Sequence, residues 1–353
     1  MSVRSIVAWS LMAISTPVFA WDSNGHRAVT YLALDGLPAD CPDWLRDPDM
    51  RQRIAYEASE PDRWRSWPSP ILGHENKPEH YVDVEDLKDF GLTLETNPRF
   101  RNEYVRALVI AKHEHPDKIS PYDAAKDTDH TSEFPGMLQY GIAEEYAKLA
   151  ASFNQLRVLL AVNDPERKNQ IEQTKANITY HMGILSHYVG DAAQPLHTTK
   201  HHHGWVGDNP GKYTTSTKVH SFIDGEVLRR HELNYATLRP SAKFDAKVNA
   251  RDPWEDVNQY ILRSHHKVEE LYKLERDGEL EKEMGKKFIT ERLTDAGAML
   301  AALYSSAWNS AAPTDKQITD YKFYDGKFEA PPAAQPANAP AKPATAAPAG
   351  NAP

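Results

Sequence analysis

The sequence lacks several features that would define a fold class directly. Cys41 is the only cysteine among 353 residues, which excludes an intrachain disulfide framework. Long apolar runs are scarce and the mean hydropathy is −0.65, which argues against a bundle of membrane-spanning helices. Alternating apolar and polar residues bounded by hairpin turns are nearly absent, so we expect little β-sheet.

The chain also lacks an excess of positive charge. It has 41 Lys and Arg against 50 Asp and Glu, and its formal net charge is −9. Such a surface does not attract phosphate groups by itself. A protein of this composition that acts on phosphate compounds needs a local source of positive charge, either clustered arginines or bound metal ions.

Both ends of the chain differ in character from the rest. Residues 1–20 have Arg4, an apolar run and then small residues before Trp21, which predicts a secretory signal peptide and an exported, periplasmic or secreted protein. The alternative is a retained anchor or a buried helix. Residues 327–353 are rich in Ala and Pro and are expected to be a disordered tail.

Between these ends, residues 21–326 are expected to form one all-α domain. Apolar residues recur at helical spacing in four segments, 25–34, 140–161, 178–193 and 291–308. Polar stretches at residues 84–135 and 200–218 are interpreted as long connections. No internal repeat or clear linker divides the domain.

The segment HYVGDAAQPLH is the most informative part of the sequence. His187 and Asp191 are four residues apart, so they share one face of a helix. Pro195 limits that helix, and the chain can then turn His197 back towards the same face. Imidazole and carboxylate groups at this spacing suit zinc, although a simple charge pair explains the segment in isolation equally well.

Further His and Asp residues strengthen the prediction of a metal site. His220 and Asp224 form a second pair at a spacing of four residues, and Asp62 and His80 add another carboxylate and imidazole. If cleavage exposes Trp21 as the N-terminus, its α-amine and carbonyl become available as ligands close to His26. Several such groups favour a site with more than one metal ion.

Taken together, these motifs resemble the zinc-dependent single-strand nucleases of fungi and plants (the S-one/P-one type), which share a superfamily with bacterial zinc phospholipase C. The resemblance covers the predicted domain in the order of its motifs: WDSNGH at 21–26, PDRWR at 61–65, HYVDVED at 80–86, HYVGDAAQPLH at 187–197 and VHSFID at 219–224. It implies an all-α fold with three zinc ions in a cleft and hydrolysis of single-stranded DNA, RNA or 3′-nucleotides. It implies no stable protein partner.

The resemblance also implies which residues bind each ion. The first ion would be held by Asp62, His80, His187 and Asp191. Asp191 would bridge to a second ion held by the amine and carbonyl of Trp21 and by His26. The third ion would be held by His197, His220 and Asp224.

Other positions match catalytic and substrate-binding residues of the family. Arg65 corresponds to the residue that stabilises the phosphate, and Asp62 is expected to accept a proton from the attacking water as well. Tyr81 matches a position that stacks on a base, and Asp83 matches one that contacts the base. Asn209 is a partial substitute for an asparagine in a loop that otherwise differs from the family.

Two other functions remain open. Zinc phospholipase C, acting on phospholipid headgroups, uses the same metal chemistry, although Asp224 and the HYVDVED motif favour the nucleases. A zinc-binding protein without catalytic activity would fit the run His201 to His203. We interpret that run as a solvated loop that binds metal adventitiously.

Overall fold

A computed structural model describes residues 21–324 and confirms the all-α fold. Within this part of the chain, extended pairing is limited to two isolated bridges, Val82 with Gly136 and His202 with Gly204. The predicted signal peptide and tail lie outside the described residues. None of the helices described is both long and apolar enough to cross a lipid bilayer.

The helices differ widely in length, and their order along the chain is as follows. The first half contains α1 (Ser23–Asp35), α2 (Pro48–Glu57), α3 (Glu60–Arg65), α4 (Pro70–Asn76), α5 (Val84–Leu87), α6 (Arg101–Glu114) and α7 (Leu138–Val162). The second half contains α8 (Lys168–Ala193), α9 (Val219–Ser221), α10 (Leu228–Arg230), α11 (Tyr235–Leu238), α12 (Trp254–His265), α13 (Val268–Arg276), α14 (Glu283–Ser310) and α15 (Asp315–Tyr324). A π-helical segment, Phe222–Val227, joins α9 to α10.

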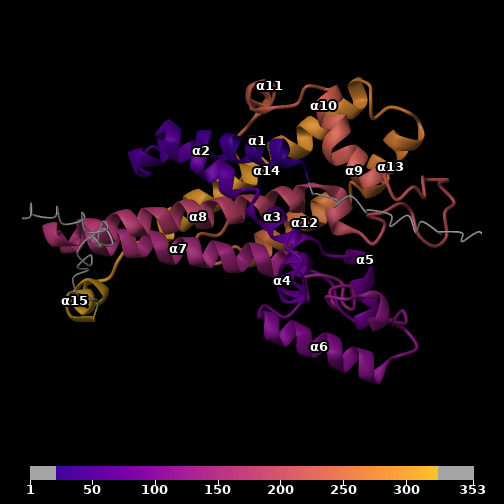
Figure 1. Cartoon of the computed structure of the whole chain (residues 1–353), viewed down its shortest axis with the longest axis horizontal. Helices are drawn as coiled ribbons and strands as arrows, with labels where there is room; N and C mark the ends of the chain where they lie inside the picture. Colours follow the sequence, from indigo (N-terminus) through magenta and orange to yellow (C-terminus); the bar gives the residue numbers. More distant parts are fainter. Residues whose placement is uncertain (1–20, 325–353) are drawn as a thin grey trace, which may run out of the picture.

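The long helices α7, α8 and α14 form the centre of the molecule, with α1 packed on α14 and α2 on α8 (Figure 1). A short connection after α7 reverses the chain, so α7 and α8 are antiparallel neighbours. The hydroxyl of Tyr304 on α14 donates to the carbonyl of Met182 on α8 at 2.5 Å. The hydroxyls of Thr30 and Ser186 lie 2.7 Å apart and join α1 to α8.

The C-terminal part of α8 is buried on every side. All residues from Met182 to Ala193 are buried, because α7, α14, α2 and α1 surround this helix. Any polar side chain in this part of α8 therefore lies in the interior, where it needs a partner. His187 and Asp191 are such side chains.

The structure corrects one of the predicted connections. Residues 84–135 include α6, a helix of 14 residues, and therefore are not a purely irregular connection. Only Tyr104 and Leu108 of this helix are buried. A helix with so few buried residues needs only a weak apolar stripe, which is why the sequence did not indicate it. Residues 200–218 form no helix, as expected.

Candidate metal centre

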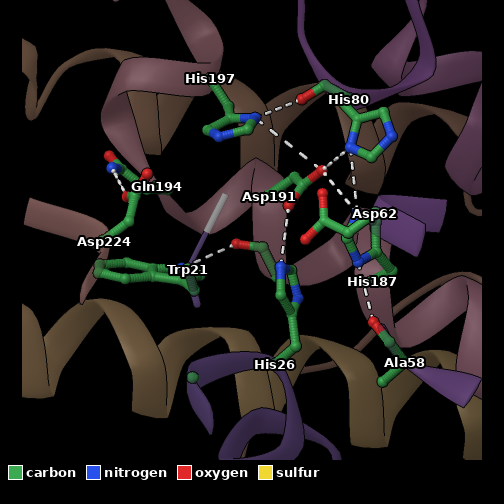
Figure 2. A network of polar contacts seen from close by, with 12 residues as sticks. Trp21, His26, Ala58, Asp62, His80, His187, Asp191, Gln194, His197 and Asp224 are labelled. Atoms are coloured by element: carbon green, nitrogen blue, oxygen red, sulfur yellow. Dashed lines mark hydrogen bonds and ion pairs between the residues drawn. The ribbon is translucent and has the colours of Figure 1, made fainter. Parts of the chain in front are cut away.

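Side chains from distant parts of the chain converge at the C-terminal end of α8 (Figure 2). Helix α1 contributes His26, α3 contributes Asp62, and a 3₁₀ turn (Lys77–His80) contributes His80. After α8 ends at Ala193, a second 3₁₀ turn (Pro195–Thr198) brings His197 back towards Asp191. The predicted turn at Pro195 is confirmed.

Asp191 is the centre of this cluster. Its Oδ2 lies 3.0 Å from Nδ1 of His80 and 3.4 Å from Nε2 of His187. Its Oδ1 lies 3.4 Å from Nε2 of His26, and Nδ1 of His197 is 3.9 Å from Oδ2. A fully buried carboxylate surrounded by four imidazoles matches the donor set that zinc prefers.

Two of these histidines are oriented by backbone carbonyls. Nδ1 of His187 lies 2.8 Å from the carbonyl oxygen of Ala58, and Nδ1 of His197 lies 2.5 Å from that of His80. When Nδ1–H donates to these carbonyls, Nε2 of each ring is unprotonated and can bind a cation. Metal-binding histidines are held in this way in many proteins.

A second part of the cluster consists of His197, His220 and Asp224. Nε2 of His220 lies 3.1 Å from Oδ2 of Asp224, as the spacing of four residues predicts. The side-chain amide of Gln194 donates to the other carboxylate oxygen of Asp224 at 2.6 Å. Asp224 belongs to the π-helical segment, a distortion that is frequent at functional sites.

Two glycines allow the first helix to approach this cluster. A Cβ atom at Gly190 would lie 2.7 Å from Nδ1 of His26, and one at Gly25 would lie 2.7 Å from Cβ of Trp21. Trp21 is fully buried, and its indole N–H donates to the carbonyl of Gly190 at 3.0 Å. The residue predicted as an N-terminal ligand thus bonds to Gly190, which directly precedes Asp191 in the sequence.

Burial strongly perturbs the titration of these groups. It lowers the pKa of His26 and of His197 to about 3, so both rings are neutral at pH 7. Burial also raises the pKa of Asp191 well above its usual value, and the Asp62 carboxylate adds to this shift. The pKa of Asp62 itself rises to about 6 through burial, although Arg65 opposes the change.

The cluster leaves many buried polar atoms without a hydrogen-bond partner. They include both ring nitrogens of His26 and of His220, Nε2 of His80 and His197, Oδ1 of Asp191 and Oδ2 of Asp224. Orphaned groups of this kind are costly unless a cation binds them. The residues present therefore fit bound metal ions.

Three groups of side chains are close enough to hold an ion each. They are His26 with Asp62 and His187, then His80 with His187 and Asp191, and finally His197 with His220 and Asp224. The third group is the predicted one. Asp62 groups with His26 rather than with His80, and the identity and number of the ions stay predictions.

A pocket of about 150 Å³ opens beside these ligands. Its walls are formed by Arg65, Lys77, His80, Tyr81, Thr131, Leu196, His197, His202, His203 and His220. Arg65 is held by Asp62, whose Oδ1 lies 3.3 Å from Nη1. In the described part of the chain, no carboxylate lines this pocket.

The predicted substrate-binding residues have different positions. Tyr81 lines the pocket, and its hydroxyl donates to the carbonyl of Thr131 at 3.0 Å. Asp83 does not line it and instead faces His202, with Oδ1 3.7 Å from Nδ1. Asn209 is engaged within its own loop, where its side chain bonds to the backbone of Tyr213 in both directions.

The sequence did not identify five residues of this pocket as part of the site: Lys77, Thr131, Leu196, His202 and His203. The run His201 to His203 lies in a loop, as expected, with His203 exposed, but His201 is buried and His202 is half-buried. His202 and His203 also line the pocket. The ring of His201 stacks on Trp205 at 3.9 Å. Aromatic residues soon after a histidine run are a signal that could have indicated this packing.

The chain matches no protein-family model and no curated protein sequence.

Proposed function

We propose that this protein is a zinc-dependent phosphodiester hydrolase of the single-strand nuclease type, exported in the cell that makes it. The observation that carries the proposal is the position of the three groups of metal-binding residues beside a pocket lined by cationic side chains and no carboxylate. A phosphodiester needs such neutralisation of its negative oxygens during hydrolysis. Although the chain as a whole is acidic, Arg65 and Lys77 supply positive charge at this pocket.

Zinc ions bound at these groups would activate water and neutralise phosphoryl charge. The protein's own residues supply the remaining steps. Arg65 lines the pocket and can donate two hydrogen bonds to the phosphoryl oxygens. Asp62 lies behind Arg65, with Oδ1 3.3 Å from Nη1, and a carboxylate at this position can accept a proton from the attacking water.

Zinc phospholipase C is the second candidate, and an exposed apolar pair favours it. Trp67 and Ile71 are 69% and 83% exposed, and they lie in the segment between Arg65 and Lys77, two residues of the pocket. Exposed Trp and Ile side chains can enter a lipid interface. Tyr81 in the pocket wall favours nucleic acid as the substrate, because aromatic rings stack on bases.

The experiment compares substrates on protein reconstituted with zinc. Single-stranded DNA, RNA and phosphatidylcholine vesicles are incubated with the wild-type protein and with the Arg65→Ala variant. We expect hydrolysis of the nucleic acids and a large loss of rate in the variant. Hydrolysis of phosphatidylcholine alone would identify the phospholipase, and zinc binding without hydrolysis would identify a non-catalytic protein.

A further inference from the structure

The pocket contains positive charge that the metal ligands do not explain. Lys77 and His202 line it together with Arg65, and neither corresponds to a residue that the proposed reaction uses. Lys77 is paired with Asp129, and His202 faces Asp83 at 3.7 Å. Neither Asp129 nor Asp83 lines the pocket.

In both pairs the basic side chain lines the pocket and its carboxylate does not. Burial lowers the pKa of His202, but its contact with Asp83 outweighs this and raises the pKa, which favours the protonated ring that a phosphate needs as a donor. The ammonium group of Lys77 has three N–H donors, so an ion pair with Asp129 leaves donors free. Nδ1 of His202 lies 3.2 Å from the carbonyl of Thr199, so Nε2 is the ring nitrogen left for a ligand. A cation held in place by a carboxylate loses less side-chain entropy when it binds an anion.

The two cations come from different elements but face the same space. Lys77 begins the 3₁₀ turn that ends at His80, and His202 belongs to the loop after His197. Because His80 and His197 are in the metal-binding groups and also line the pocket, Lys77 and His202 lie beside the position of the reacting phosphate. They are therefore placed to bind a neighbouring group of the same substrate.

We propose that Lys77 and His202 form a second anion-binding subsite, which takes the phosphate next to the reacting one in a single-stranded nucleic acid. This inference rests on the proposed function and specifies its substrate as an oligonucleotide. A choline headgroup carries a quaternary ammonium, which this cationic wall would repel. Nucleic acid supplies the required negative charge at every nucleotide.

The test measures the preference for a longer strand in the zinc-loaded protein. The values of kcat/KM are compared for a thymidine dinucleotide with a single phosphate and for a ten-residue oligothymidylate. In the Lys77→Met and His202→Gln variants, we expect the preference for the longer substrate to fall by about tenfold, as for the loss of a charged hydrogen bond. Lys77→Arg, which keeps the charge, should retain most of the preference.

Matched controls come from ion pairs outside the pocket. Nζ of Lys112 lies 2.7 Å from Glu133, and Nδ1 of His181 lies 2.9 Å from Glu145. The Lys112→Met and His181→Gln variants should keep the wild-type preference. A fall of the same size in these controls would show that the loss of any ion pair disturbs the pocket, and it would overturn the proposal.

A binding measurement provides a readout that is independent of turnover. The affinity for a hydrolysis-resistant phosphorothioate oligothymidylate is measured at several salt concentrations by fluorescence anisotropy. Each lost phosphate contact should reduce the slope of log K against log salt by about 0.7. An unchanged slope and an unchanged preference in Lys77→Met would overturn the subsite but leave the proposed function intact.

Failure of the proposed function has a different signature. If the wild-type protein hydrolyses neither thymidine substrate, the proposed function is wrong, and the subsite that rests on it is wrong as well. If it hydrolyses both substrates with equal kcat/KM, the reaction is as proposed but no flanking phosphate is bound.

Discussion

Replacing Asp191 with asparagine should remove two metal ions and not one. The carboxylate contacts His80 and His187 through Oδ2 and His26 through Oδ1, so it joins two of the groups that can hold an ion. Asparagine has nearly the same shape but no charge, and its amide nitrogen binds zinc poorly. Asp191 is itself a member of the group with His80 and His187, and that group shares His187 with the group of His26 and Asp62. The group of His197, His220 and Asp224 shares no residue with these two and should retain its ion.

The expected loss of stability follows from the number of ions lost. At a free zinc concentration about 100 times its Kd, each bound ion stabilises the folded protein by about 2.7 kcal/mol. Losing two ions therefore costs about 5 kcal/mol. For a protein of this size, that difference lowers Tm by roughly 8 °C.

The effect should depend on zinc. Without metal, burial and the neighbouring Asp62 carboxylate oppose the charge of Asp191, as the raised pKa indicates. An amide relieves this cost, so the metal-free variant should be at least as stable as the metal-free wild type.

The assay combines zinc analysis by mass spectrometry with thermal unfolding, each with and without a chelator. Asp35→Asn is a suitable control, because this carboxylate pairs with Arg51 and Arg239 and belongs to none of the three metal-binding groups. Zinc content in Asp191→Asn equal to that of the wild type would refute the bridging role. So would an equal loss of Tm in the presence and absence of zinc.

Three further predictions follow from the same geometry. Arg65→Ala should lower kcat by at least about 100-fold and leave the zinc content unchanged; steady-state kinetics with metal analysis measures both, and an unaltered kcat would exclude Arg65 from the reaction. A chain with Met retained before Trp21 should bind less zinc and react more slowly than one that begins with Trp21, because an amide nitrogen is a poor ligand; equal zinc content and rates would contradict this. The metal-free protein should lose stability as the pH falls from 6.5 towards 3, because burial lowers the pKa of His26 and His197 to about 3 and only the unfolded chain binds those protons in that range. Burial also lowers the pKa of His80, His187 and His220, so five histidines act in this direction, and the raised pKa values of Asp62, Asp191 and Asp224 oppose it only in part. Urea unfolding from pH 7 to pH 4 measures the trend, and a midpoint that rises on acidification would contradict it.

The helices were predictable where apolar residues recur at helical spacing along the sequence. Helix α8 carries apolar residues at helical spacing, and its buried side predicted the common face of His187 and Asp191. Helix α6 escaped prediction because only Tyr104 and Leu108 of its residues are buried. A helix that rests on the surface by two side chains leaves little periodic signal.

The candidate site was predictable in part. Local spacing predicted the contact between His220 and Asp224, which the structure has at 3.1 Å. The spacing did not indicate the π-helical segment that carries Asp224, because such a distortion depends on the surrounding packing. The pairing of His202 with Asp83 joins two loops far apart in sequence, and no local pattern encodes it.

The most direct test of the proposed metal-dependent phosphodiester hydrolysis is a zinc titration of the chelator-treated protein. Bound zinc is measured at each step together with the rate of cleavage of single-stranded DNA. We expect binding to reach three ions per chain, with activity appearing only when the sites that share Asp191 are filled. Full cleavage by the metal-free protein, or saturation with zinc and no cleavage of any phosphodiester, would contradict this function.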